Sequence, residues 1–292
     1  MDKNYYDSDL LKIYEKSFRD NWSLPALAEY GSDEVLSYGE MARRIARFHL
    51  FFQQVGLKPG DKVALLGKNS ATWVMCFMAT ITYGATIVPI LADFNARDAQ
   101  HIINHSGSTL LFVNQSLWEP FEYDQMPCVK AVISLETRQV LAERPSKGEN
   151  PVERIIRNLT RRFRSVYKAG FNPEDIKYPD VARDATAVIN YTSGTTGFSK
   201  GVMLTYDNLC GNVVFGARSR LHYEGSRALS FLPLAHAYGC AFDMLVPLAV
   251  GTFVTIFGKA PTPKLLLAAL AKVRPNLVVC VPLILEKICL LY

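Results

Sequence analysis

The sequence lacks closely spaced pairs of cysteines. Its six cysteines are spread over 292 residues, and no two of them form a C-x-x-C pair. Most lie among apolar residues, a pattern that favours buried, reduced thiols over a disulfide framework or a zinc site. We therefore expect a protein of the cytoplasm.

A basic start followed by an apolar core is also missing at the N-terminus, so the sequence predicts no secretory signal. One uncharged run, residues 73–92, is long enough to cross a bilayer. Gly84 and Pro89 interrupt it, and β-branched residues gather after Gly84. This pattern favours a buried helix at 71–83 and a buried strand at 85–90 over a membrane span.

Excess positive charge is confined to one segment. The net charge is +5, and six basic residues between 154 and 168, with no acid among them, contribute +6. The rest of the chain is nearly neutral, which argues against a nucleic-acid surface. Because residues 138–180 are rich in proline, they predict a long connection that carries a surface helix. The alternative is a basic amphipathic helix at 154–168 that contacts the anionic inner face of a membrane.

Apolar runs alternate with helical patterns along most of the chain. Ser37 and Glu40 form a capping-box pattern before a helix, and Asn95 and Thr262 are expected to cap two more. The apolar runs are continuous rather than alternating, which predicts parallel strands covered on both faces. The strands expected on this basis are 63–66, 85–90, 110–113, 129–135, 228–232, 252–257 and 276–281. We predict an α/β fold with two related αβ subdomains and mainly parallel sheets, at 1–180 (with the basic connection at 138–180) and 181–292.

A loop between two strand patterns holds the clearest functional signal. Residues 191–201 read Y-T-S-G-T-T-G-F-S-K-G. Glycines let backbone N–H groups turn inward, hydroxyls add donors, and Lys200 adds a positive charge, which together suit a polyphosphate. The Walker A spacing G-x-x-x-x-G-K-[ST] is not met, and G-x-G-x-x-G is absent from the loop. No G-x-S-x-G elbow exists around Ser193, because Tyr191 stands in place of its first glycine.

The longer string Y-T-S-G-T-T-G-F-S-K-G-V-M-L-T-Y-D-N resembles the signature of the adenylate-forming superfamily, which includes acyl-CoA synthetases, adenylation domains of nonribosomal peptide synthesis and luciferases. Residues 36–40, 82–90 and 232–239 resemble further conserved segments in the same order, and 281–288 resembles one typical of long-chain fatty acyl-CoA synthetases. Ser199 departs from the family pattern, which usually has proline there. The resemblance implies the large N-terminal domain of these enzymes, without the C-terminal domain that carries a catalytic lysine.

The resemblance also implies a reaction in two steps. A carboxylate attacks ATP to give an acyl adenylate and pyrophosphate, and CoA then displaces AMP. Thr192 is the expected Mg²⁺ ligand, Lys200 is expected to stabilise charge on the phosphates, and His236 is expected beside the acyl carboxylate. The phosphate cradle implied by the resemblance comprises Thr192, Ser193, Gly194, Thr195, Thr196, Gly197 and Lys200.

Several alternatives stay open at this point. His236 can instead be a core histidine, and Gly239 can serve close backbone approach or simply the start of a helix. His101 and His105 have metal-pair spacing, but the glutamate of H-E-x-x-H is absent. We expect the N-terminal part of a fatty-acid–CoA ligase, inactive by itself and cut within a larger protein. The other readings are an adenylation domain for an amino or aryl acid and a non-catalytic chain that binds a nucleotide or an acyl ligand. The acyl chain length and the oligomeric state are not predicted.

Overall fold

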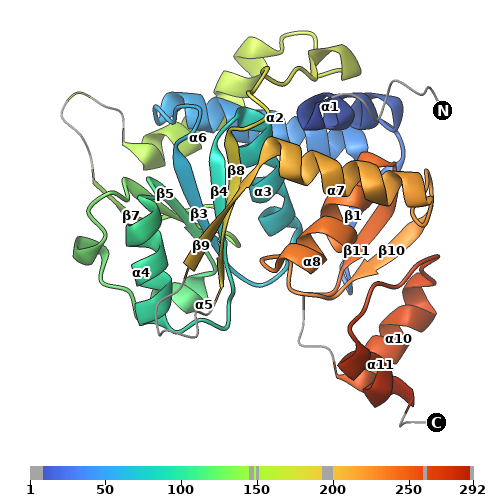
Figure 1. Ribbon diagram of the computed structural model, residues 1–292. Helices are drawn as coiled ribbons and strands as arrows, with labels where there is room; N and C mark the ends of the chain where they lie inside the picture. Colours follow the sequence, from blue (N-terminus) through green and yellow to red (C-terminus); the bar gives the residue numbers. More distant parts are fainter. Residues whose placement is uncertain (1–8, 145–147, 149–150, 193–199, 259–261, 290–292) are drawn as a thin grey trace. The chain divides into compact units, whose positions relative to one another are not determined.

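The computed structural model describes residues 9–144, 148, 151–192, 200–258 and 262–289. The chain divides into two compact units that interleave in sequence (Figure 1). The first unit holds Met1–Ala42, Asn69–Ala71 and Asp207–Tyr292, and the second holds Arg43–Lys68 and Thr72–Tyr206. The sequential domain division at residue 180 stays a prediction.

The second unit is built on a seven-stranded sheet in the order β7-β6-β5-β3-β4-β8-β9. Its pairs are parallel from β6 to β8 and antiparallel at both edges, between β6 and β7 and between β8 and β9. Every residue of β4, β5 and β6 is buried, as continuous apolar strands predict. The strands are β3 (Lys62–Leu66), β4 (Thr86–Ile90), β5 (Leu110–Val113), β6 (Ala131–Ser134), β7 (Val140–Glu143), β8 (Thr186–Thr192) and β9 (Lys200–Thr205).

Helices connect these strands. The run that is long enough for a membrane span is the buried helix α3 followed by β4, and residues 73–82 of α3 are all buried. Within the described ranges, no helix combines the length and apolar character needed to cross a membrane. Asn95 caps α4, since its side chain accepts a hydrogen bond from the Asp98 amide at 2.9 Å. The helices are α3 (Ala71–Tyr83), α4 (Ala96–Ser106), α5 (Gln115–Trp118) and α6 (Val152–Val166), with short 3₁₀ turns at Tyr123–Gln125 and Pro173–Asp175.

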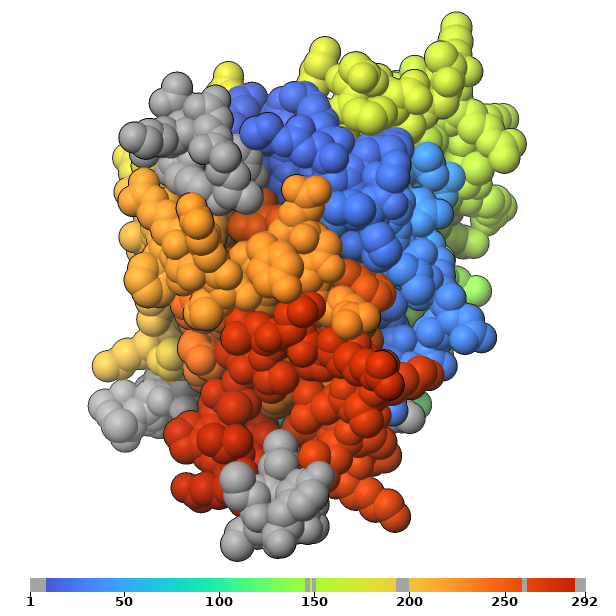
Figure 2. Space-filling view, turned by 90° about the vertical axis from the view of Figure 1, so that its right-hand side faces the viewer, coloured from blue at the N-terminus to red at the C-terminus, as the bar shows by residue number. Residues whose placement is uncertain are grey.

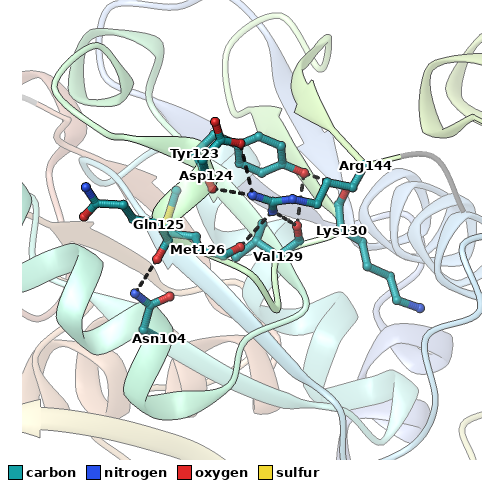
Figure 3. Close-up of polar contacts among 8 residues, drawn as sticks. All are labelled: Asn104, Tyr123, Asp124, Gln125, Met126, Val129, Lys130 and Arg144. Carbon is teal, nitrogen blue, oxygen red and sulfur yellow. Dashed lines mark hydrogen bonds and ion pairs between the residues drawn. The ribbon is translucent and has the colours of Figure 1, made fainter.

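Arg144, directly after β7, fixes the loop that leads into β6 (Figure 3). Its guanidinium donates to the carbonyl oxygens of Met126, Val129 and Tyr123 at 2.8, 3.0 and 2.7 Å. The same group lies 4.0 Å from the centre of the Tyr123 ring. One planar, charged fork therefore satisfies three carbonyls that no strand pairs.

The first unit is built on a four-stranded sheet in the order β10-β11-β1-β2, with only the β1–β2 pair antiparallel. The strands are β1 (Pro25–Glu29), β2 (Val35–Ser37), β10 (Arg227–Ser230) and β11 (Phe253–Ile256). The helices are α1 (Leu10–Asp20), α2 (Tyr38–Gln54, which continues into the second unit), α7 (Tyr206–Ser219), α8 (Ala237–Cys240), a π-helical turn at Ala241–Leu245, α9 (Val246–Ala249), α10 (Pro263–Val273) and α11 (Pro282–Cys289).

The expected capping box at the start of α2 is present. The Glu40 carboxylate accepts from the Ser37 amide at 2.9 Å, and the Ser37 hydroxyl accepts from the Glu40 amide at 3.1 Å. The strand predictions are wrong in two respects. The strands β1, β2 and β7 were not predicted, and the strand expected at 276–281 is reduced to one bridge between Ala228 and Leu277.

The C-terminal segment, red in Figure 2, reaches the surface of the first unit. Leu266 and Ala269 of α10 are buried against the β10 side of the sheet, but Leu283 and Leu285 of α11 are 58% and 54% exposed. The described apolar side chains of α10 and α11 are therefore only partly used in the core of this unit.

Candidate functional site

The hydroxyl-rich loop is the connection of the β8–β9 hairpin in the second unit. Thr192 and Lys200 are directly opposite in the antiparallel register and form the last pair of the ladder before the connection. Opposite residues of an antiparallel pair project their side chains to the same face. Both are exposed, so a hydroxyl and an ammonium group stand together at the base of the connection. Ser193, Gly194, Thr195, Thr196 and Gly197 lie outside the described residues.

Tyr191 anchors this hairpin to the sheet. Its side chain is only 5% exposed and lies opposite Gly201 in the register. A Cβ atom on Gly201 would lie 3.0 Å from both the Tyr191 Cζ and the Ile189 Cγ2. Glycine at 201 therefore lets the tyrosine ring cross the neighbouring strand directly beside Lys200.

A histidine of α4 holds the other end of the tyrosine. The Nδ1 atom of His105 lies 2.7 Å from the Tyr191 hydroxyl oxygen. The His101 and His105 rings are 5.7 Å apart, but the part of the chain that the structure describes contains no group of three side chains suited to a metal ion. The observed role of His105 is thus to bind Tyr191, a role that the sequence did not predict.

His236 lies in the first unit, at the N-terminal end of α8. It is exposed, which excludes the interpretation as a core histidine. Its amide donates to the Pro233 carbonyl at 3.0 Å, and its carbonyl accepts from the Cys240 amide at 2.8 Å. The backbone amide and carbonyl of His236 are therefore both hydrogen-bonded, while its imidazole is accessible. The expected position of this imidazole beside an acyl carboxylate remains a prediction.

Gly239 is needed for close backbone approach. A Cβ atom at this position would lie 2.6 Å from the Pro233 carbonyl oxygen and 3.2 Å from the Leu232 Cβ. Real Cβ atoms do not tolerate the shorter distance without a backbone shift. Of the two interpretations left open by the sequence, close approach is the one that the geometry supports.

Two polar side chains that sequence reasoning missed hold the 232–236 segment. Asn69 donates to the Leu232 carbonyl at 2.7 Å and accepts from the Leu234 amide at 3.0 Å. Asp243 lies in the π-helical turn, and its Oδ2 is 3.4 Å from the Leu232 amide. Asp243 is 2% exposed, and this burial raises the pKa of its carboxyl to about 7. In the sequence, the only hint of this role is that Asp243 is a single acidic residue within an apolar helical pattern.

The described residues fit a magnesium site only in part. Mg²⁺ is held mainly by carboxylates, waters and substrate phosphates. Thr192 can offer one hydroxyl oxygen, and Lys200 opposite it favours an anion rather than a cation. Thr192 is therefore suited to be a single protein ligand of an ion that phosphates already hold.

Comparison with known proteins gives a consistent result. Residues 15–291 match a family described as "AMP-binding enzyme". The chain is similar to a long-chain-fatty-acid–CoA ligase of Salmonella typhimurium (26% identical, 83% of this chain and 45% of the relative) and to the human long-chain-fatty-acid–CoA ligase ACSBG2 (28% identical, 95% and 41%). It thus spans less than half the length of these two relatives. The N-terminal domain of FACL13 from Mycobacterium tuberculosis shares the fold, with a TM-score of 0.76, 22% identity and coverage of 96% of this chain and 64% of that one.

Proposed function

Because the chain belongs to the AMP-binding enzyme family, we propose that it provides the phosphate-binding hairpin of an ATP-dependent fatty-acid–CoA ligase. The observation that carries this proposal is the pair formed by Thr192 and Lys200 at the base of the signature loop. Fatty acids are the favoured substrates because both curated relatives described above are long-chain-fatty-acid–CoA ligases.

In the first step, a carboxylate oxygen attacks the α-phosphorus of ATP and the bond to the pyrophosphate oxygen breaks. Negative charge then grows on the departing pyrophosphate. An ammonium group and hydroxyl donors fixed at that place lower the barrier electrostatically. Lys200 supplies the charge, and Thr192, with Ser193, Gly194, Thr195, Thr196 and Gly197, supplies hydroxyl and amide donors. When bound, Mg²⁺ would neutralise phosphate charge, with Thr192 as its ligand from this chain.

The second step uses the thiol of CoA, which attacks the acyl carbonyl carbon and releases AMP. His236 is the residue we assign to the neighbourhood of the acyl carboxylate. Its exposed ring at the start of α8 is free to reach a substrate, and Asn69 and Asp243 keep the backbone before it in place. Gly239 permits α8 to approach the Pro233 carbonyl oxygen closely, directly beside His236.

The activity is tested by ATP–pyrophosphate exchange with a panel of carboxylates on a full-length version of the protein. We expect exchange with long-chain fatty acids. Exchange only with amino or aryl acids would replace the lipid substrate by another carboxylate, and ATP binding without any exchange would indicate a non-catalytic chain. Since the 292 residues span less than half of the curated relatives, we expect them to form no acyl-CoA by themselves.

We also propose that α6 contacts an anionic membrane surface at the cytoplasmic face. Ile155 and Phe163, on its apolar side, are buried in the second unit, so the contact would be electrostatic rather than an insertion. The exposed residues that support it are Arg154, Arg161, Arg162 and Arg164. Binding to anionic vesicles should fall as salt rises, and an absence of binding at low salt would reject this role.

A further inference from the structure

A cavity of about 920 Å³ lies within the second unit, apart from the β8–β9 hairpin, which contributes none of its lining. Residues of α2, α3, β5, the β6–β7 turn and α6 surround it. Its volume is at the upper end of the range of small-molecule sites. Aromatic and aliphatic side chains contribute to its lining, among them Phe48, Phe51, Met75, Phe112 and Leu159.

The charged residues that line the cavity are mostly basic. Four arginines line it (Arg44, Arg47, Arg138 and Arg157), against one acid, Glu153. Glu153 is engaged with Arg157 at 2.8 Å. A lining that combines apolar side chains with an excess of three positive charges is the complement of an anionic amphiphile.

The side chain of Arg47 shows the effect of this positive charge. Its guanidinium lies 5.0 Å from the centre of the Phe163 ring, and its buried Nε has no hydrogen-bond partner among the described residues. Burial lowers the pKa of Arg47, and the neighbouring arginines 43, 138, 44 and 164 lower it further. Because arginine does not give up its proton in proteins, the cluster keeps its repulsion, which a bound anion would relieve.

Arg138 stands at the rim of the cavity in a backbone conformation that arginine rarely adopts. Its φ is +60°, and its amide donates to the Ser134 carbonyl at 2.9 Å in the turn between β6 and β7. A left-handed conformation of this kind suits glycine or asparagine better. The turn therefore carries a guanidinium at a position where glycine or asparagine would be easier to accommodate.

We propose that this cavity binds a single-chain anionic amphiphile, with a carboxylate or phosphate head on Arg47 and Arg138 and its acyl chain among Phe48, Phe51 and Phe112. Paired guanidinium groups bind planar carboxylates and phosphates through charge-assisted hydrogen bonds. The acyl chain replaces water beside these three phenylalanine side chains. This site is separate from the Thr192–Lys200 pair and does not depend on the proposed ligase activity.

The test is calorimetric titration of the 292-residue chain with oleoyl lysophosphatidate and with oleate, each below its micelle concentration. These two arms distinguish a phosphate from a carboxylate head. Monooleoylglycerol tests whether an acyl chain binds without a charged head group. Inorganic phosphate tests whether the head group binds without an acyl chain. We expect binding of one or both anionic amphiphiles and at least tenfold weaker binding of the other two compounds.

Variants locate the site. The double variant Arg47→Gln with Arg138→Gln should weaken binding on the order of tenfold or more. Its matched control is Arg97→Gln with Lys130→Gln, which removes the same charge from exposed positions of the second unit that lie outside this cavity and outside α6. Equal loss in both double variants would overturn the proposal, because it would show attraction to net charge alone.

A second measurement does not depend on the stability of the variants. Oleate that carries a photoreactive group near the end of its chain is crosslinked to the unaltered protein, and the labelled peptides are identified by mass spectrometry. Labelling of residues 48–51, Phe112 or residues 156–160 supports the cavity. Labelling confined to other parts of the chain overturns it.

Discussion

The imidazole of His105 and the phenol of Tyr191 meet almost at right angles, with 2.7 Å between Nδ1 and the hydroxyl oxygen and 87° between the ring planes. Tyr191 directly precedes Thr192, and His105 lies in the last turn of α4. A partly buried hydrogen bond therefore ties α4 to the edge hairpin at the residue before the signature loop. Such a contact fixes where β8 ends and how Thr192 leaves the sheet.

Tyr191→Phe removes this hydrogen bond and keeps the ring. We expect unfolding in urea to show a loss of about 1 kcal/mol, the usual contribution of one hydrogen bond. In the full-length protein, the KM for ATP should also rise, because the start of the loop is less fixed. The control is Tyr83→Phe, which removes a 3.0 Å bond to the Leu57 carbonyl in the same unit, away from the hairpin. The same KM in both variants would contradict a positioning role for Tyr191.

Lys200→Ala should slow adenylation in the full-length protein by about a hundredfold or more, since removal of one preorganised charge from a transition state has effects of this order. Pyrophosphate exchange measures the rate, and circular dichroism checks the fold. The control is Lys130→Ala, an exposed lysine whose ammonium points away from the Arg144 network in Figure 3. An unchanged exchange rate would remove Lys200 from the mechanism.

Gly239→Ala should destabilise the first unit by about 1–3 kcal/mol, because the new methyl group would stand 2.6 Å from the Pro233 carbonyl oxygen. The matched control is Gly211→Ala in α7, where a Cβ atom meets nothing within 4 Å. That substitution should stabilise the protein by up to about 1 kcal/mol, because alanine favours the helix. Thermal unfolding of both variants measures the difference, and similar melting temperatures would speak against close packing at Gly239.

Asp243 predicts a pH dependence of stability. The pKa of its carboxyl is about 7 in the fold, against 3.8 for an ordinary aspartate, so the folded state holds its proton to higher pH than the unfolded chain does. Its contribution to the free energy of unfolding therefore falls as pH rises from about 4 to about 7, by up to about 4 kcal/mol in all.

Asp243→Asn removes the titrating group and should leave stability higher than that of the unaltered protein at pH 8 and closer to it at pH 4. Urea unfolding at several pH values between 4 and 8 measures this. Asp33→Asn, at an exposed position, serves as the control and should leave the pH profile unchanged. If the Asp243→Asn profile runs parallel to that of the unaltered protein, the carboxyl does not titrate in this window.

Arg144→Lys keeps the charge but loses the planar fork that binds three carbonyl oxygens at once. We expect the free energy of unfolding to fall by about 2–3 kcal/mol, because charge-assisted hydrogen bonds to the three carbonyl oxygens are lost. Arg97→Lys, at an exposed position of α4, should change it by less than about 0.5 kcal/mol. Comparable losses in the two variants would mean that the Arg144 network contributes little to stability.

Many helix boundaries were predictable from the sequence because their signals are local. The caps formed by Ser37, Asn95 and Thr262 involve partners three residues away, and all three are observed. The apolar runs of β3, β4 and β5 were equally clear, since a strand buried on both faces needs apolar residues throughout.

Strands with distant partners were not predictable in this way. The five-residue β1 pairs in parallel with β11, so that Leu27 stands beside Val254. Its short pattern shows nothing of a partner at the other end of the chain. At 276–281 a strand was predicted, but this apolar run forms only a single bridge. A strand forms only where a neighbouring strand offers free backbone groups in register, and an apolar run alone does not show this.

The sequence by itself predicted strands on both sides of residues 193–199, and β8 and β9 confirm them. It also predicts a phosphate-binding loop there, because hydroxyls, glycines and a lysine in that order suit few ligands other than phosphates. The tertiary structure decided what holds its ends. It placed His105 on Tyr191, Asn69 on the Leu232 and Leu234 backbone, and an arginine cluster on an apolar cavity. These contacts join residues far apart in sequence, and only the packing of helices on sheets brings such groups within hydrogen-bond distance.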